Sequence, residues 1–273
     1  MSGARSSTFI VTKEHRRFTE FAEAVRKHRY IGLCYGPAGV GKTLSARRYA
    51  HWNLAGPVIE TWKRHDPRSQ AQVNAALARS RTIFHTPTVL GTLRDLRDTL
   101  DAHITRVELC IDDHLHRDVK GCRIVEYQHL VELLIFDEAE RLSTTALEFL
   151  RDLFDRTRVG VILIGMPGME KRLSRYPQLY SRIGFAHHYR PLQGDELAFV
   201  LTRHWRQLGL TLDEADFTDT QAIASIARIT GGNFRLLHRL FVQIERILKI
   251  NGLSVITDDV VEAAHSTLVI GVT

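Results

Sequence analysis

A glycine-rich segment, Gly36-Pro-Ala-Gly-Val-Gly-Lys-Thr43, matches the phosphate-binding pattern GxxxxGK[ST] in full. It follows a short apolar run at 30–35 and precedes a segment of helical character, the context that this pattern requires. Glycines let backbone N–H groups turn inward around phosphates, and the following helix N-terminus adds partial positive charge. Lys42 can then act in catalysis at the β- and γ-phosphates, while the Thr43 hydroxyl can hold Mg²⁺. The segment predicts a site for ATP and Mg²⁺, formed by Gly36, Pro37, Ala38, Gly39, Val40, Gly41, Lys42, Thr43 and Leu44.

Two carboxylates follow a second apolar run. Residues 133–136 are all apolar, and Asp137 and Glu138 come directly after them. Such a run predicts a buried strand, whose carboxyl end in a parallel sheet lies beside the phosphate loop. We therefore expect Asp137 to steady the Mg²⁺ shell and Glu138 to polarise an attacking water. A solvated acidic turn has the same letters, but a phosphate loop about 90 residues upstream favours the catalytic interpretation.

The elements that must position these residues alternate along the first 190 residues. Apolar runs predict strands at 30–35, 81–85, 133–136 and 159–164, and helical periodicity begins at Thr12 and recurs at 42–52, 68–80, 90–103 and 147–154. Gly56-Pro57 is expected to end one helix, with a short strand or a loop at 58–62. Residues 105–130 show no clear period. Strands that alternate with helices indicate a parallel sheet covered on both faces.

After Pro191 the strand signals stop. Helical character continues at 194–209, 218–230, 233–250 and 257–265. The sequence therefore predicts an α/β protein in three parts. These are a basic N-terminal helix at 1–29, a phosphate-loop core with a parallel sheet at 30–190, and a small helical lid at 191–273.

Composition excludes several classes of protein. The hydrophobic fraction is 44% and the charged fraction 25%, an ordinary globular balance that excludes disorder, collagen-like chains and coiled-coil rods. No apolar run approaches the roughly 20 residues of a membrane-spanning helix, and the N-terminus lacks the apolar stretch of a signal peptide. Cys34, Cys110 and Cys122 form no CxxC pair, which argues for a reducing compartment and against a structural zinc. We expect a cytoplasmic protein without membrane contact.

The charge is unevenly distributed. The net charge is +6, but residues 191–273 hold 7 Lys/Arg and 10 Asp/Glu, a net charge of −3, so residues 1–190 carry +9. A basic body favours a polyanionic partner. A solvated basic surface is the alternative interpretation.

The two motifs and the helical C-terminal part together resemble an AAA+ ATPase. Two further stretches are similar to the TnsC/TniB group of transposition regulators, of which MuB and IstB are more distant members. They are Asp137-Glu-Ala-Glu-Arg-Leu142, and Gly165-Met-Pro-Gly-Met-Glu-Lys-Arg-Leu173 followed by Tyr180-Ser-Arg-Ile183. The resemblance covers about residues 12–250 and implies the AAA+ core and lid.

The resemblance also implies roles for individual residues. In this family an arginine after the fourth core strand reaches the nucleotide of the neighbouring subunit, and Arg182 occupies that place, with Arg175 in reserve. A surface or lid-packing arginine is the alternative interpretation of Arg182. Gly231-Gly-Asn-Phe-Arg235 matches the lid turn that senses the γ-phosphate, which assigns that role to Arg235. A glycine turn that caps the following helix is the other reading. Met166 stands where the family usually has a polar residue that orients the lytic water, which implies slow hydrolysis.

Members of the group assemble on double-stranded DNA, which implies contacts between the second core strand and the acidic strand, at about 86–130. The candidates in this window are Thr105, Arg106, Arg117, Lys120 and Arg123. Such groups neutralise phosphates and give affinity without sequence preference. For each of them a solvated charge or polar group is the alternative.

The resemblance thus implies a bacterial, cytoplasmic, ATP-dependent regulator of transposition. ATP-bound subunits would self-associate into a ring or helical filament on target DNA and recruit or activate a transposase, and slow hydrolysis would disassemble the oligomer. The alternatives are a cytoplasmic ExeA-like ATPase of a secretion or envelope system, and an origin-recognition or helicase-loading ATPase. We expect neither, because no membrane helix, peptidoglycan-binding segment or winged helix is recognisable in the sequence.

Overall fold

The computed structural model describes residues 9–63, 66–115, 130–213 and 215–268. The chain divides into two compact units. The first consists of residues 17–36 and 42–189, and we call it the sheet unit. The second consists of residues 1–16, 37–41 and 190–273, and we call it the helical unit.

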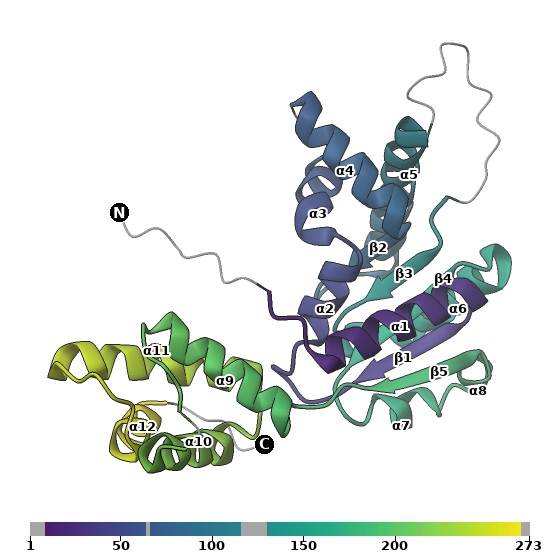
Figure 1. Ribbon diagram of the computed structural model, residues 1–273. Helices are drawn as coiled ribbons and strands as arrows, with labels where there is room; N and C mark the ends of the chain where they lie inside the picture. Colours follow the sequence, from purple (N-terminus) through teal and green to yellow (C-terminus); the bar gives the residue numbers. More distant parts are fainter. Residues whose placement is uncertain (1–8, 64–65, 116–129, 214, 269–273) are drawn as a thin grey trace. The chain divides into compact units, whose positions relative to one another are not determined.

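Five parallel strands form the sheet. They are β1 (Ile31–Tyr35), β2 (Thr82–His85), β3 (Leu133–Phe136), β4 (Gly160–Gly165) and β5 (Ile183–His188), and their order across the sheet is β2-β3-β4-β1-β5 (Figure 1). Tyr35 pairs with Gly165 and His188, and His85 pairs with Phe136, so all five strands end at one edge. This carboxyl edge carries the loop after β1 and the carboxylates after β3.

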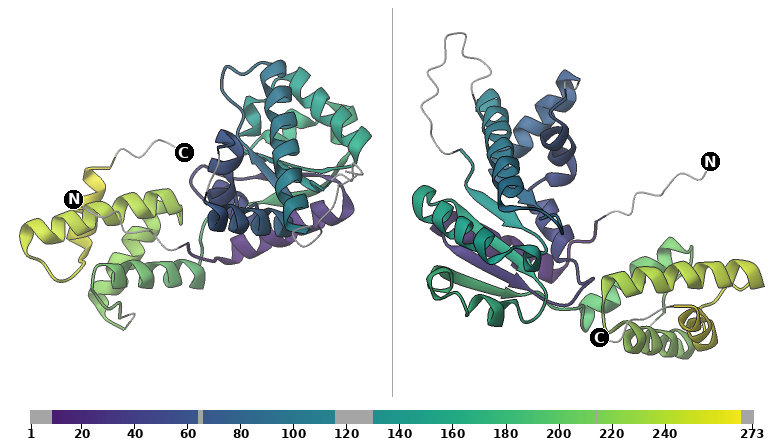
Figure 2. Two further views of the ribbon diagram at one scale, coloured as in Figure 1. Left: turned by 90° about the horizontal axis from the view of Figure 1, so that it is seen from above. Right: turned by 180° about the vertical axis from the view of Figure 1, so that it is seen from behind.

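Helices cover both faces of this sheet, which confirms the predicted α/β fold (Figures 1 and 2). The helices that precede β5 in the chain are α1 (Lys13–His28), α2 (Lys42–Tyr49), α3 (Trp52–Thr61), α4 (Pro67–Ser80), α5 (Leu93–Leu115), η1 (Ala139–Arg141), α6 (Thr144–Thr157), α7 (Met169–Leu173) and α8 (Pro177–Tyr180). Every residue of β3 and β4 is buried, as expected of strands covered on both sides. The two strands therefore hold the groups at their ends on a rigid base.

The prediction that Gly56-Pro57 ends a helix was wrong. Helix α3 runs through both residues, and residues 58–61 are helical rather than a strand or a loop. Trp52, Ala55 and Ile59 are almost fully buried at helical spacing, so their burial outweighs the hydrogen bond that a proline removes. Gly56 also lies against the Trp52 indole, where a Cβ atom would approach Nε1 to 2.8 Å.

Two other segments differ from the sequence-based expectation. Helix α5 continues to Leu115, because His103 and Cys110 occupy buried helical positions alongside Leu100 and Val107. Strand β5 occupies residues 183–188, where no strand was predicted from the sequence. Its residues alternate between half-buried and exposed, but two of them are histidines, which hide the period-2 pattern of an edge strand.

The helical unit has its own core. Helices α9 (Asp195–Gln207), α10 (Phe217–Thr230), α11 (Phe234–Asn251) and α12 (Asp258–Ser266) enclose buried side chains such as Trp205 and Ile244. Side chains cap three of these helices: Asp216, Asn233 and Thr257 each accept a hydrogen bond from a backbone N–H of the first turn. Within the described ranges, no helix is both long enough and apolar enough to cross a membrane.

Candidate nucleotide site

The phosphate loop connects β1 to α2, as its pattern predicts. Gly39 and Gly41 adopt φ values of 80° and 112°, a region that residues with a Cβ atom rarely enter. Val40 is buried, whereas Leu44 on α2 is exposed. Helix α2 begins at Lys42, so the glycine-rich loop leads directly into a helix N-terminus. The first N–H groups of a helix lack intrahelical acceptors and can bind an anion. This arrangement suits the binding of phosphate.

Lys42 is buried despite its charge, with only 8% of its surface exposed. Its Nζ atom donates a hydrogen bond of 2.6 Å to the carbonyl oxygen of Gly36, at the start of the loop. A buried ammonium group is stable only when acceptors surround it. A neutral carbonyl is a weaker partner for this group than phosphate oxygens would be.

Asp137 lies at the end of β3 with 4% of its surface exposed. Its backbone N–H donates to the carbonyl of His85 at 2.9 Å, which ties it to the end of β2. Burial raises the pKa of the Asp137 carboxyl, and a hydrogen bond from the Thr43 hydroxyl together with the charge of Lys42 partly opposes this shift. The sheet unit thus brings Lys42, Thr43 and Asp137 together.

These residues fit a Mg²⁺ ion. A hydroxyl and a carboxylate that already contact each other are hard oxygen ligands, and Mg²⁺ in phosphoryl-transfer sites takes few protein ligands besides phosphate oxygens and water. The carboxylate is also costly to ionise where it is buried, so a cation would relieve its desolvation.

Glu138 follows in a left-handed conformation, with φ 50°. It precedes the short helix η1, and its side chain is 44% exposed. An oxygen of its carboxylate forms an ion pair with the guanidinium group of Arg141, three residues later. The predicted water-polarising group is therefore paired with Arg141, which was not among the predicted site residues, although its Glu-x-x-Arg spacing from Glu138 is visible in the sequence.

In the helical unit, the turn at 231–235 contacts the middle of the phosphate loop. Asn233 Nδ2 donates to the carbonyl of Ala38 at 2.6 Å, and the backbone N–H of Arg235 donates to the carbonyl of Gly39 at 3.2 Å. A Cβ atom on Gly39 would lie 2.5 Å from Asn233 Oδ1, so only glycine permits this approach. Asn233 also caps α11, which agrees with the capping interpretation of this turn. The Arg235 side chain is exposed.

The two arginine candidates between β4 and β5 differ in their surroundings. Arg182 forms a two-pronged ion pair with Asp155 on α6, with Nε–Oδ1 at 2.6 Å and Nη2–Oδ2 at 2.8 Å. The Arg182 guanidinium is the main reason that the pKa of the Asp155 carboxyl is lowered. The Arg175 side chain is exposed, and no hydrogen bond or ion pair joins its guanidinium group to another described residue. Met166 directly follows β4 and is 39% exposed.

The structure describes two of the five predicted DNA-contact residues, and both lie on α5. Thr105 donates its hydroxyl hydrogen to the carbonyl of Asp101. Arg106 donates to the carbonyl of Ile59 at 2.7 Å, and its guanidinium group lies 5.6 Å from the ring centre of Trp62. Arg106 therefore holds the end of α3 and is not a solvated charge. Arg117, Lys120 and Arg123 lie outside the described residues.

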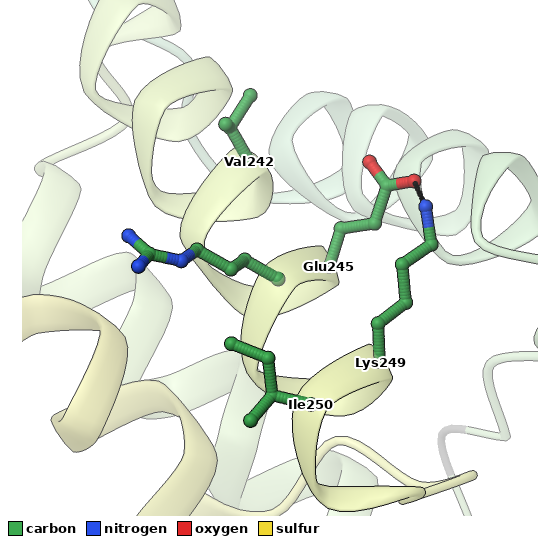
Figure 3. A pocket seen from close by; sticks show the side chains of 5 residues that line it. Val242, Glu245, Lys249 and Ile250 are labelled. Carbon is green, nitrogen blue, oxygen red and sulfur yellow. Dashed lines mark hydrogen bonds and ion pairs between the residues drawn. The ribbon is translucent and has the colours of Figure 1, made fainter.

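An open depression on α11 contains none of the predicted site residues (Figure 3). Its lining comes from one helix: Val242, Glu245, Arg246, Lys249 and Ile250. Lys249 pairs with Glu245 at 2.8 Å, one helical turn apart. This arrangement is typical of a solvated helix surface, and we assign no ligand to it.

Comparisons with known proteins agree with the geometry of the phosphate loop. The chain matches a family described as an AAA domain over residues 25–173. A Staphylococcus aureus protein named "Potential ATP-binding protein" is 43% identical over 271 residues, which cover 98% of this chain and 99% of that protein.

Solved structures show the likeness of fold. The Holliday junction branch migration motor RuvB of Thermotoga maritima superposes with a TM-score of 0.55 at 18% identity, over 95% of this chain and 70% of RuvB. The ORC2 protein of Aeropyrum pernix in its ADP form has a TM-score of 0.51 at 15% identity, over 90% of this chain and 67% of ORC2.

Proposed function

We propose that this chain, which belongs to the AAA domain family and has the P-loop AAA+ fold, is a slow ATPase. From the similarity of two of its stretches to the TnsC/TniB group, we also propose that it regulates DNA transposition. The observation that supports ATP chemistry most directly is the contact between Thr43 and the buried Asp137 carboxylate, next to the buried Lys42. We further propose that residues 30–190 form the nucleotide-binding core and residues 191–273 form a lid.

In this proposal Lys42 exchanges the Gly36 carbonyl for the β- and γ-phosphates, and Gly36–Leu44 wrap the phosphates with backbone N–H groups. Bound Mg²⁺ supplies positive charge at the phosphoryl oxygens, and Thr43 and Asp137 are the residues that would hold it. Glu138 polarises the attacking water. Met166 offers that water no hydrogen bond, which keeps turnover slow.

Two arginines would respond to the γ-phosphate. Arg235 would sense it within the same chain, since the backbone N–H of Arg235 already bonds to the carbonyl of Gly39 in the phosphate loop. Arg182 would reach the nucleotide of a neighbouring copy and stabilise the charge that develops on the transferred phosphoryl group. This step requires Arg182 to leave Asp155, so assembly would be coupled to a change of ion-pair partner.

The regulatory part of the proposal rests on the similarity to the TnsC/TniB group and on the charge of +9 over residues 1–190. A fold shared with RuvB, whose name describes a Holliday junction motor, is compatible with a role on DNA. We propose that ATP-bound copies form a ring or helical filament on double-stranded DNA and recruit a transposase. Thr105, Arg106, Arg117, Lys120 and Arg123 remain the proposed contact residues.

Binding to duplex DNA tests this function. Two labelled duplexes of unrelated sequence are titrated with the chain and a slowly hydrolysed ATP analogue at several salt concentrations, and the assemblies are viewed by electron microscopy. We expect nucleotide-dependent oligomers, similar affinity for both duplexes, and a linear dependence of log affinity on log salt. Lys120→Ala together with Arg123→Ala should lower the slope by about one per lost phosphate contact.

The partner is tested with a purified transposase, taken from the genes that neighbour this one if they encode such an enzyme. It should bind the ATP-bound assembly on DNA and not the ADP-bound chain. ATP binding without any DNA-dependent assembly would contradict the regulatory proposal and leave the nucleotide site intact. Recruitment of a replicative helicase in place of a transposase would favour the helicase-loading alternative.

A further inference from the structure

The Arg141 side chain, at the end of η1, contacts two separate segments of the chain. Its Nη2 atom pairs with the Glu138 carboxylate, and its Nη1 atom donates to the carbonyl of Pro87 at 3.1 Å. Pro87 lies in the loop between β2 and α5 and is itself buried. Because the guanidinium group is planar and rigid, one side chain connects both sites and keeps a fixed orientation between them.

The backbone conformation contributes to this pair. Glu138 directly precedes η1 and Arg141 is its last residue, so the two side chains lie one short turn apart and meet in the ion pair. Arg141 N–H also donates to the carbonyl of Glu138 at 2.9 Å, which closes the turn. The left-handed φ of Glu138 would otherwise be unfavourable for a residue with a Cβ atom. The carboxylate is therefore held where Arg141 can reach it.

A different arginine fixes the backbone of the same turn. Arg172 on α7 donates to the carbonyl of Glu140 at 2.7 Å and also to the carbonyl of Leu142. These bonds do not involve the Arg141 side chain. Removal of that side chain should therefore release Glu138 and leave the turn in place.

We propose that Arg141 is a positioning residue that restrains Glu138 in the isolated chain. A carboxylate that polarises water needs a lone pair directed at that water, within hydrogen-bond distance. A guanidinium donor on Oε2 occupies such a lone pair and neutralises part of the charge. Hydrolysis then requires the pair to open, and the Pro87 carbonyl makes opening depend on the loop after β2. This inference rests on the proposed role of Glu138.

The test is a double-mutant cycle on the full chain. Wild type, Arg141→Ala, Glu138→Gln and the double variant are compared for steady-state ATP hydrolysis without DNA. We expect Arg141→Ala to raise kcat about two- to fivefold, the range that opening a half-exposed ion pair permits, with unchanged KM. In the Glu138→Gln background the same change should have no effect, because no carboxylate remains to be released.

Two further variants separate this role from support of the fold. Arg172→Ala removes the bonds that hold the turn, so its thermal midpoint and kcat should both fall. Arg141→Lys keeps the charge without the two-armed fork, and its kcat should lie between wild type and Arg141→Ala. If Arg141→Ala does not fold, Arg141→Lys decides: a kcat above wild type supports the restraint.

Other results overturn the inference. An unchanged or lower kcat in well-folded Arg141→Ala shows that Arg141 does not restrain Glu138. If Arg141→Ala raises kcat equally in the wild-type and Glu138→Gln backgrounds, its effect does not act through Glu138. If Glu138→Gln hydrolyses ATP like wild type, the proposed catalytic role of Glu138 itself fails, and this outcome is distinct from a failure confined to Arg141.

Discussion

The charged side chains at the two edges of the sheet differ in the partners that they contact. At the carboxyl edge, the buried Asp137 contacts the Thr43 hydroxyl, and Lys42 bonds to a neutral carbonyl. At the amino edge, Glu132 lies within ion-pair distance of three arginines, Arg26, Arg29 and Arg81, at 3.6, 3.7 and 3.3 Å. The buried Lys42 and Asp137 at the carboxyl edge have the chemistry to bind phosphate oxygens and Mg²⁺ in addition to their contacts within the chain. The amino edge satisfies its charges within the chain.

The amino-edge arginines also support the ends of elements. Arg26 donates to the carbonyl of Ser80 at 2.9 Å, at the end of α4, and Arg29 donates to the carbonyl of Glu132 at 3.0 Å. Terminal helical carbonyls have no partner in their own helix, so a cation is favourable there. The sign and number of the charges at an edge therefore do not tell which edge carries the functional site. What matters is whether the chain itself completes their coordination, and ligands of open α/β sheets bind at the carboxyl ends.

The largest expected effect is at the carboxyl edge. Lys42→Ala removes the charge that would meet the β- and γ-phosphates, so ATP affinity should fall at least about 100-fold in a calorimetric titration. Lys171→Ala, which removes an exposed lysine on α7, is the matched control and should bind ATP like wild type. Near-normal binding by Lys42→Ala would contradict the nucleotide site and remove the contrast between the edges.

The next effect concerns Arg182, which precedes β5 at the amino edge. If it acts on a neighbouring copy, Arg182→Ala should bind ATP normally and lose most of the DNA-stimulated hydrolysis, about tenfold or more. Mixed with Glu138→Gln, it should regain part of the lost rate at mixed interfaces. A mixture no more active than its separate parts would make Arg182 another structural arginine of this edge and turn attention to the exposed Arg175.

The carboxyl edge was largely predictable because its information is contiguous. Eight consecutive residues define the phosphate loop, and the apolar run 133–136 directly precedes Asp137 and Glu138. Local patterns of this kind fix the end of a strand and the start of a helix without knowledge of the remaining chain. The α/β fold followed from the same alternation of apolar runs and helical periods.

The amino edge was not predictable because its contacts join distant residues. Arg29 and Glu132 are 103 residues apart, and neither local sequence predicts that the two residues pair. For the same reason the sequence could not show that Arg106 holds the end of α3. Helix α3 itself, with Pro57 inside it, forms because tertiary burial outweighs local propensity, and propensity is all that a sequence window reports.

A smaller effect is expected from the centre of the amino edge. Glu132→Ala leaves three arginines close together without their shared anion, so the free energy of unfolding should fall by about 2 kcal/mol in urea titrations. ATP affinity should not change. Asp98→Ala, which removes an exposed ion pair with Arg94, is the control and should cost under about 0.5 kcal/mol. A large loss of ATP affinity in Glu132→Ala would show that the two edges are coupled.

The smallest effect compares one aspartate from each edge. Burial raises the pKa of Asp137 above its ordinary value of 3.8, so in the pH range just above 3.8 the folded chain binds more protons at this group than the unfolded chain. Its ionisation therefore costs stability as the pH rises through that range. Arg182 lowers the pKa of Asp155, so Asp155 contributes stability above pH 3.8 that is lost as the pH falls below it.

Amide substitutions at these two positions should therefore have opposite signs. Without nucleotide at pH 7, Asp137→Asn should raise the thermal midpoint and Asp155→Asn should lower it. The Asp137 difference should shrink as the pH falls toward 4, whereas the Asp155 difference should persist at pH 4 and shrink only below it. With Mg²⁺ and ATP the order at Asp137 should reverse, because wild type gains the stabilisation of a bound ligand and the amide is a poorer partner for the cation. If Asp137→Asn is less stable than wild type without nucleotide, the carboxylate is already satisfied by the chain. The carboxyl edge would then be built like the amino edge, and its groups would not be poised for a ligand.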